Sequence, residues 1–241
     1  MSDEQSVLDV QVANRICVLI LNRPERRNAL SRAMNDALRT ALLKADVDPA
    51  VSVIAITGAG STFCAGADLK DARSKDDAGQ AYRGPLHQPE RTVFEVMLDA
   101  RKPIVGIVNG PATAGGCELA LACDLRVGGP RTRFSLPETA IGLLPTAGGT
   151  TRLARLVGVS RAKEMILGGR VLDPETALAW GLLHRVVDDP RAEAAAWAVE
   201  LSGRDATALR KAKARLDADE SDGALLGERV SEAGLYERRR R

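Results

Sequence analysis

Apolar runs of strand length recur through the first half of the chain. Val7 to Val12 alternates loosely and Ile16 to Leu21 is continuous, with Asn14-Arg15 between them, so a hairpin is predicted. Val51 to Thr57 and Ile104 to Val108 are apolar without clean alternation. That pattern is typical of strands covered on both faces, so the two runs predict a buried sheet.

Segments with helical periodicity lie between these strands, and after about Arg152 they make up most of the chain. Ser31 can cap a helix that runs to about Ala45, with Met34, Leu38, Ala41 and Leu42 on one face. Ala114 to Ala122 predicts a short apolar helix, and Leu125 to Val127 a third strand. After about Arg152 we expect helices at Leu153 to Leu156, Ala162 to Leu167, Pro174 to Trp180 and Ala192 to Leu201. The first two thirds are therefore expected to be α/β and the last third α.

Several strand–strand–helix units appear, without a repeat of fixed period. We expect an α/β core over residues 1–190 and a helical region over residues 191–241. The polar stretch from Asp71 to Pro89 predicts a mobile loop, and the mixed charges of Arg204 to Asp222 predict a solvated helix face. The final residues, Arg238 to Arg241, are expected to be a disordered terminus, with a phosphate-binding tail as the alternative.

Composition limits the class of protein. With 241 residues, 45% of them hydrophobic, the chain can form one large domain or two small ones around a substantial core. A net charge of +2 gives no reason to expect nucleic acid or a membrane as partner, and 3% aromatic residues argue against a base-stacking surface. Met1 to Gln5 lacks the features of a signal or transit peptide, and the apolar runs are too short to cross a membrane. We expect a soluble, cytoplasmic protein.

Metal, disulfide and nucleotide motifs are not found. The four cysteines form no C-x-x-C pair and are expected to be reduced thiols. Because His87 and His184 are the only histidines, no ligand cluster forms and no metal is expected. Gly58-x-Gly60 follows a strand, but Phe63 occupies the third glycine position, so a dinucleotide fingerprint is rejected. A phosphate loop, a zinc helix and a G-x-S-x-G serine motif are also absent.

Three glycine-rich segments follow predicted strands: Cys64 to Leu69, Ala114 to Leu119, and Pro145 to Thr150. Small residues let a ligand approach the backbone. Gly115-Gly116 also opens a helix, whose free N–H groups and positive dipole end face that ligand. Such donors suit a developing oxyanion, where each can contribute about 3 kcal/mol in the transition state. Packing or turn geometry is the alternative explanation of such a glycine pair.

Two glutamates accompany these segments. Glu118 lies in the first turn of the helix that Gly115 opens, in the apolar setting of Cys117 to Ala122, and Glu138 follows a strand and a turn. A surface charge favoured by the helix dipole is the ordinary explanation of Glu118. Burial, however, is costly for a carboxylate and raises the pKa of a carboxyl group toward the range useful in proton transfer. The residues by themselves are compatible with an acid–base enzyme that acts beside an activated carbonyl.

Several motifs occur in one order along residues 6–215. They are Leu21-Asn22-Arg23-Pro24 with Asn28-Ala29-Leu30, Thr62 to Lys70, Asn109 to Ala112, Gly115 to Ala120, and Phe134 to Glu138 with Gly142, Pro145 and Gly148-Gly149-Thr150. Together they resemble the crotonase (enoyl-CoA hydratase/isomerase) family, most closely a bacterial enoyl-CoA hydratase. The resemblance implies an α/β fold, a spiral of ββα units followed by a helical C-terminal region. It also implies a homotrimer or a homohexamer.

The resemblance implies a role for each candidate residue. The amides of Ala67 and Gly115 would hold a thioester enolate. Relatives that hydrate carry both glutamates, and simple isomerases generally only the second, so Glu118 and Glu138 imply hydration of trans-2-enoyl-CoA to 3-hydroxyacyl-CoA. Glu118 would be the general base on water, while Glu138 would hold that water and protonate Cα. Coenzyme A would be part of the substrate, without a metal or redox cofactor. The coenzyme A and acyl path would be lined by Arg26, Ala65, Asp68, Leu69 and Lys70.

The sequence departs from the family pattern at three places. Thr146 stands where short-chain hydratases commonly have glycine, so it would narrow the acyl pocket or add a hydroxyl. Ala114 replaces another frequent glycine, a change expected to matter little. Family members usually carry further helices beyond Tyr236, so either the lid is shortened or Arg238 to Arg241 replace a phosphate partner. The alternatives are another crotonase reaction (isomerase, decarboxylase or thioesterase), an RNA-binding relative, or an inactive thioester binder.

Overall fold

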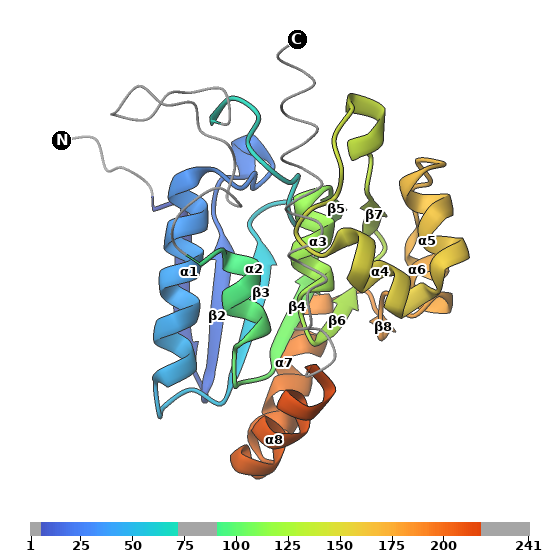
Figure 1. Ribbon diagram of the computed structural model, residues 1–241. Coiled ribbons are helices and arrows are strands. Elements are labelled where there is room, and N and C mark those ends of the chain that lie inside the picture. The colour runs from blue at the N-terminus through green and yellow to red at the C-terminus, as the bar shows by residue number, and fades with distance from the viewer. Residues whose placement is uncertain (1–5, 72–90, 218–241) are drawn as a thin grey trace, which may run out of the picture.

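A six-stranded sheet forms the centre of the molecule (Figure 1). The computed structural model describes residues 6–71 and 91–217. The strand order is β1-β2-β3-β4-β6-β8, antiparallel at the first pair and parallel at the others. The strands are β1 Leu8–Ala13, β2 Ile16–Leu21, β3 Val53–Gly58, β4 Ile104–Val108, β6 Leu125–Gly128 and β8 Arg185–Val186.

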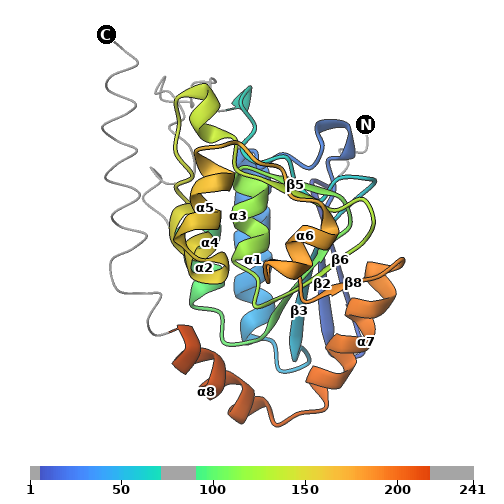
Figure 2. The same ribbon diagram turned by 90° about the vertical axis from the view of Figure 1, so that its right-hand side faces the viewer.

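Helices cover both faces of this sheet (Figure 2). They are α1 Arg32–Val47, α2 Val93–Leu98, α3 Gly115–Leu121, α4 Gly149–Val157, α5 Val159–Ile166, α6 Pro174–Ala179, α7 Pro190–Ser202 and α8 Ala206–Asp217. Two short 3-10 turns, η1 Pro24–Arg26 and η4 Glu138–Ile141, lie in the loops.

The predicted hairpin of β1 and β2 is confirmed. Ala13 pairs with Ile16, which leaves Asn14 and Arg15 as a two-residue turn. Both turn residues have a positive φ, 49° and 64°, as a type I′ turn requires. Asparagine tolerates a positive φ better than most residues, so the turn sequence and the two apolar runs both favour the hairpin.

The central strands are buried on both faces, as their unbroken apolar sequence predicts. On β3, Ile54 and Ile56 belong to the larger core cluster, which also contains the buried residues of α1 and α3. Val53 and Ala55 point to the opposite face, where α7 covers them. Figure 2 shows α1 and α3 on one side of the strands and α7 on the other. This two-sided burial is why the strands carry no polar alternation.

Local signals set the ends of the helices. The Ser31 hydroxyl caps α1 by accepting a hydrogen bond from Met34 N at 3.2 Å, so the predicted cap is confirmed. The sequence pattern did not predict α2, because its residues are apolar at every position except Glu95 and therefore show no helical periodicity. Its signal is a capping box, in which the Thr92 and Glu95 side chains each bond the other residue's backbone amide.

A second, smaller set of strand contacts lies beside the main sheet. β5 (Pro111–Thr113) pairs in parallel with β7 (Arg133–Ser135), and single bridges extend the row. These bridges join Leu30 to Ala67, Cys64 to Ala112, and Phe134 to Leu172. The strands β2, β3, β4 and β6 are thus each followed by a short extended segment and then a helix. The predicted α/β spiral of ββα units is confirmed.

The last third of the described chain is helical, as predicted. The helices α4 to α7 coincide with the four expected segments, and α8 has no buried residue, as a solvated helix requires. The predicted loop after Asp71 and the arginine tail lie outside the described residues. The domain division at residue 190 stays a prediction; α7 packs directly on the sheet. Within residues 6–71 and 91–217 no helix combines the length and apolarity needed to cross a membrane.

Candidate active site

The structure brings the two predicted oxyanion amides together. A Cβ built on Gly115 would lie 3.5 Å from Gly66 Cα and 3.6 Å from Ala67 N, so the two glycine-rich segments touch. Leu30 pairs with the segment around Ala67, because the Leu30 amide donates to Gly66 O and the Asp68 amide donates to Leu30 O. In this pairing the Ala67 N–H points away from Leu30. In the described chain neither the Ala67 nor the Gly115 amide donates a hydrogen bond to the protein. Two neighbouring donors are therefore available to one acceptor.

Backbone geometry explains the small residues at this contact. Gly66 has a φ of +89°, and a Cβ there would lie 2.9 Å from both Ala114 Cβ and Thr113 O. Ala114 itself has φ 52° and ψ −127°, a conformation that favours glycine. The expectation that alanine at position 114 matters little is therefore wrong for the backbone, because the residue before Gly115 is strained.

Gly115 and Gly116, which begin α3, have different roles. A Cβ on Gly116 would lie only 2.0 Å from Cys64 O, so this glycine is required for packing between α3 and the first glycine-rich segment. A Cβ on Gly115 would meet nothing closer than 3.5 Å. The packing explanation therefore holds for Gly116, whereas Gly115 leaves its amide at the open end of the helix.

The backbone of a third segment bonds the buried carboxyl group of Glu118. It is 4% exposed, and its Oε1 accepts hydrogen bonds from Ala147 N at 2.7 Å and Gly149 N at 2.9 Å. These amides lie at the amino-terminal end of α4, where Gly148 turns the chain with a φ of +102°. Two N–H donors and the positive end of a helix both favour the ionised form.

Glu138 has the opposite environment. It begins η4, is 7% exposed, and its Oε2 has no hydrogen-bond partner among the described residues. Burial raises the pKa of Glu138 from its ordinary 4.5 to about 7, against a smaller opposing effect of its own backbone amide. Near neutral pH this carboxyl can therefore both give and take a proton.

Cys117 is a buried thiol whose pKa both glutamates affect. Burial is the main cause that raises the pKa of the Cys117 thiol well above 9.0, and the charges of Glu138 and Glu118 raise it further. Both glutamates therefore act electrostatically on one buried thiol. They differ in hydrogen bonding, because two amides bond Glu118 Oε1 whereas Glu138 Oε2 has no partner among the described residues.

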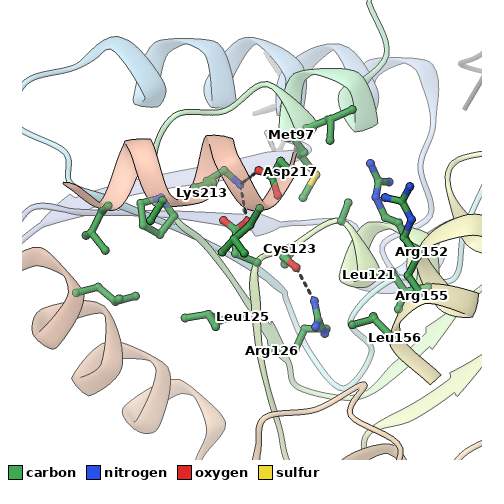
Figure 3. A pocket seen from close by; sticks show the side chains of 18 residues that line it. Met97, Leu121, Cys123, Leu125, Arg126, Arg152, Arg155, Leu156, Lys213 and Asp217 are labelled. Carbon is green, nitrogen blue, oxygen red and sulfur yellow. Dashed lines mark hydrogen bonds and ion pairs between the residues drawn. The ribbon is translucent and has the colours of Figure 1, made fainter. Parts of the chain in front are cut away.

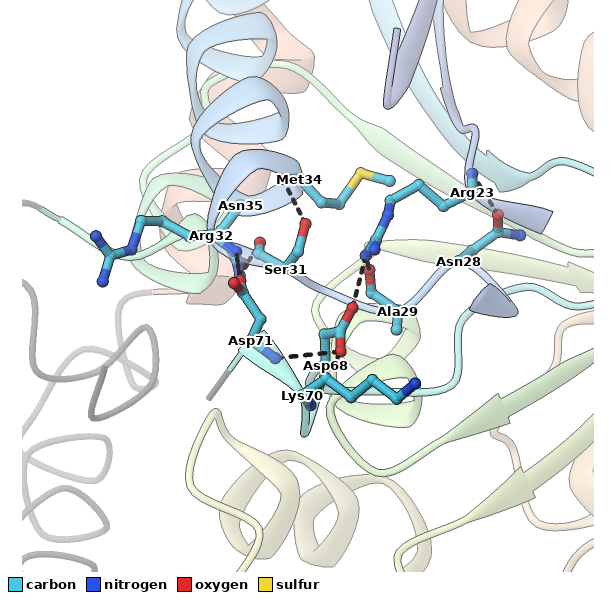
Figure 4. A network of polar contacts seen from close by, with 10 residues as sticks. All are labelled: Arg23, Asn28, Ala29, Ser31, Arg32, Met34, Asn35, Asp68, Lys70 and Asp71. Carbon is cyan, nitrogen blue, oxygen red and sulfur yellow. Dashed lines mark hydrogen bonds and ion pairs between the residues drawn. The ribbon is translucent and has the colours of Figure 1, made fainter. Parts of the chain in front are cut away.

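Asp68 ties the first glycine-rich segment to the loop after β2 (Figure 4). Its Oδ2 pairs with Arg23 Nη1 at 3.0 Å, and its Oδ1 accepts from the amides of Lys70 and Asp71 at 3.1 and 3.4 Å. Burial opposes ionisation, but the hydrogen bonds from Arg23 and the two amides outweigh it and lower the pKa of Asp68. In this structure the carboxylate positions the loop, while the neighbouring Leu69 and Lys70 are exposed.

The remaining predicted residues lie around this centre. Arg26 is exposed on η1, and Ala65 is partly buried with its amide bonded to Arg27 O at 3.0 Å. Thr146 is buried at 8% exposure, next to the amide that holds Glu118. Arg152, which was not predicted from the sequence, is a buried residue whose Nη1 donates to Ala147 O at 3.0 Å. Its signal was an arginine on the apolar face of a helix that follows a glycine-rich turn.

A separate cavity of about 460 Å³ lies at the other end of α3 (Figure 3). Its walls include Cys123 and Leu125 beyond the last turn of α3, and Lys213 of α8. Arg152 lines this cavity and also bonds the Ala147 carbonyl, so it lies between the two regions. The glutamates do not line it.

Metal ligands are not gathered in the part of the chain that the structure describes. Residues 6–71 and 91–217 contain no group of three or more histidine, cysteine, aspartate or glutamate side chains placed to hold a metal ion.

Known proteins are similar to this chain in sequence and in fold. The sequence model described as enoyl-CoA hydratase/isomerase matches residues 11–239. A probable enoyl-CoA hydratase, echA8, of Mycobacterium bovis is 35% identical over 232 residues, which cover 95% of this chain and 86% of the relative. The 2,3-dehydroadipyl-CoA hydratase of Escherichia coli is 41% identical over 181 residues, 75% of this chain and 69% of the relative. The crystal structure of an enoyl-CoA hydratase from Mycobacterium smegmatis superposes with a TM-score of 0.82 at 34% identity, covering 96% of this chain and 98% of that one. The chain belongs to the enoyl-CoA hydratase/isomerase, or crotonase, family.

Proposed function

We propose that this protein catalyses the reversible hydration of trans-2-enoyl-CoA to 3-hydroxyacyl-CoA. The observation that carries the proposal is the opposed setting of two buried glutamates, Glu118 with two amide donors and Glu138 with none on its Oε2. Addition of water across a double bond needs one group that removes a proton and one that supplies a proton. The family and its hydratase relatives support the same reaction class.

The Ala67 and Gly115 amides would bind the thioester carbonyl oxygen. Charge develops on this oxygen as water adds to Cβ, because the electrons of the double bond move toward the carbonyl. Two N–H donors fixed by the surrounding backbone meet that charge without rearrangement. The close contact between Gly66 and Gly115 supports this pairing of donors.

The glutamates would then divide the proton transfers. Glu118 removes a proton from the water as its oxygen bonds to Cβ, which gives an enolate. Glu138, neutral before this step, donates its proton to Cα and restores the thioester carbonyl. Glu118 ends protonated and Glu138 ionised, so one proton passes between them, or through solvent, before the next turnover. A Glu138 pKa of about 7 suits a group that must change state in every cycle.

Coenzyme A would enter as part of the substrate. The exposed Arg26, Leu69 and Lys70, together with Ala65, would line its path, and Asp68 would hold that segment in place through Arg23. Hydration changes no oxidation state, so the reaction itself calls for no redox cofactor. We further propose a homotrimer or homohexamer in the cytoplasm.

The test is the loss of conjugated enoyl-thioester absorbance when purified protein is mixed with crotonyl-CoA or a longer enoyl-CoA. Glu118→Gln and Glu138→Gln keep the shape of each side chain and remove its acid–base function. We expect hydroxyacyl-CoA as the product and a loss of activity of about two to four orders of magnitude in either variant.

Product analysis separates the hydratase from its rivals. Isomerisation of a 3-enoyl-CoA needs only one carboxyl group to move a proton between two carbons, so it would survive in Glu118→Gln. No loss of absorbance, with isomerisation of 3-enoyl-CoA instead, would replace hydration by isomerisation. Release of free coenzyme A or of carbon dioxide would indicate a thioesterase or a decarboxylase.

A further inference from the structure

Thr146 is a largely buried residue whose hydroxyl no group of the described chain bonds. Its exposure is 8%, and its hydroxyl makes no hydrogen bond within residues 6–71 and 91–217. The buried side-chain atoms of the described chain that lack a hydrogen-bond partner are Asn35 Oδ1 and Glu138 Oε2, so the Thr146 hydroxyl, which is not among them, still reaches accessible space. An accessible hydroxyl that no protein group bonds is available to donate a hydrogen bond to a ligand or to accept one from it.

The position of Thr146 relates this hydroxyl to the substrate. The next residue, Ala147, donates its amide to Glu118 Oε1 at 2.7 Å. Along α3, Glu118 lies three residues after the oxyanion donor Gly115, about 4.5 Å further along the helix axis. In the proposed binding mode the Gly115 amide bonds the acyl carbonyl oxygen, and Cβ lies at Glu118. The rest of the acyl chain therefore continues toward the segment that contains Thr146.

We propose that the Thr146 hydroxyl binds a polar group on the acyl chain beyond Cβ, so that the enzyme prefers hydroxylated or similarly polar enoyl-CoA substrates. This inference rests on the proposed function.

Two pairs of substrates of matched size isolate the polar contact. They are 4-hydroxy-2-butenoyl-CoA against 2-pentenoyl-CoA, and 5-hydroxy-2-pentenoyl-CoA against 2-hexenoyl-CoA, in which a hydroxyl replaces a terminal methyl. The readout is the ratio of kcat/KM for the hydroxylated member over that for the apolar member. We expect a ratio at least fivefold higher in the natural protein than in Thr146→Val for one of the pairs, the size of one neutral hydrogen bond.

Thr146→Val keeps the shape of the side chain and removes only the hydroxyl. Thr146→Ser keeps the hydroxyl and should retain most of the preference. Equal loss on both members of each pair in Thr146→Val would overturn the proposal, since that pattern indicates a role in the chemical step. A ratio that does not differ between the natural protein and Thr146→Val would overturn it as well. If Thr146→Val is not folded, Thr146→Ala gives the same comparison.

The experiment separates this inference from the proposed function. Hydration of all four thioesters without a preference leaves the hydratase proposal standing and removes the role of Thr146. If no thioester is hydrated, the hydratase proposal fails, and dissociation constants measured by calorimetry replace the rates. Tighter binding of a hydroxylated thioester that Thr146→Val abolishes would then still support the contact, and equal binding would refute it.

Discussion

Replacing Glu138 by glutamine should stabilise the protein at alkaline pH. The carboxyl is 7% exposed and its Oε2 has no partner, so its ionised form is poorly solvated in the folded state. Burial accordingly raises the pKa of Glu138 from 4.5 to about 7. Glutamine has almost the same shape and carries no charge at any pH, so it removes this unfavourable ionisation.

The sign and the size follow from the two pKa values. Below pH 4.5 the carboxyl is neutral in both the folded and the unfolded chain, so the variant and the natural protein differ little. Between pH 4.5 and 7 the folded protein holds a proton that the unfolded chain has lost, and the natural protein loses stability as the pH rises. Above pH 7 the loss is complete. A tenfold change in proton affinity is worth about 1.4 kcal/mol, so the total is about 3 kcal/mol.

Urea unfolding at pH 5.0 and pH 8.5 measures this difference. The advantage of Glu138→Gln in the free energy of unfolding should grow by about 2 to 3 kcal/mol between the two conditions. Glu118→Gln is the matched control, because it removes a charge that two amides and the start of α4 stabilise. It should lower stability by about 1 to 2 kcal/mol at pH 8.5. The same pH dependence in Glu138→Gln and the natural protein would refute the reasoning.

Three further substitutions test the backbone around the site. Gly116→Ala places a Cβ 2.0 Å from Cys64 O and should prevent stable folding. Gly115→Ala makes no contact under 3.5 Å, so this variant should unfold cooperatively near the melting temperature of the natural protein. Equal melting curves for the two variants would contradict this. Ala114→Gly removes a strained φ of 52° worth about 1 to 3 kcal/mol at an entropic cost of about 0.5 to 1 kcal/mol, so urea unfolding should show equal or higher stability. Asp68→Asn breaks the ion pair with its arginine partner at 3.0 Å and should raise KM more than it lowers kcat; an unchanged KM would argue against its role in positioning the loop.

The sequence predicted those elements whose signals are local. Asn14-Arg15 between two apolar runs was sufficient for the hairpin, and Ser31 before a 3.6-residue period was sufficient for α1. The unbroken apolar runs of β3 and β4 indicated burial on both faces without saying which elements cover them. The helix α2 was not predicted, because its one clear signal is the Thr92–Glu95 capping box and its apolar residues show no helical period.

The candidate site was predicted as a set of residues, not as an arrangement. Motif order pointed to Glu118, Glu138, Ala67 and Gly115, but it gave no reason for the two glutamates to differ. That difference arises from the amides of Ala147 and Gly149, about thirty positions along the chain from Glu118, which bond its carboxyl group while Glu138 Oε2 has no partner among the described residues.

The sequence alone thus determined the strands, most of the helices, the glycine-rich turns and the chemistry of the side chains. Each depends on neighbours within a few residues, through periodicity, capping and the backbone freedom of glycine. Only the tertiary structure decided which groups meet, as where Gly66 touches Gly115 and where the start of α4 reaches Glu118. Proton affinity depends on burial and on hydrogen bonds from distant segments, so the contrast between Glu118 and Glu138 exists only in the folded protein.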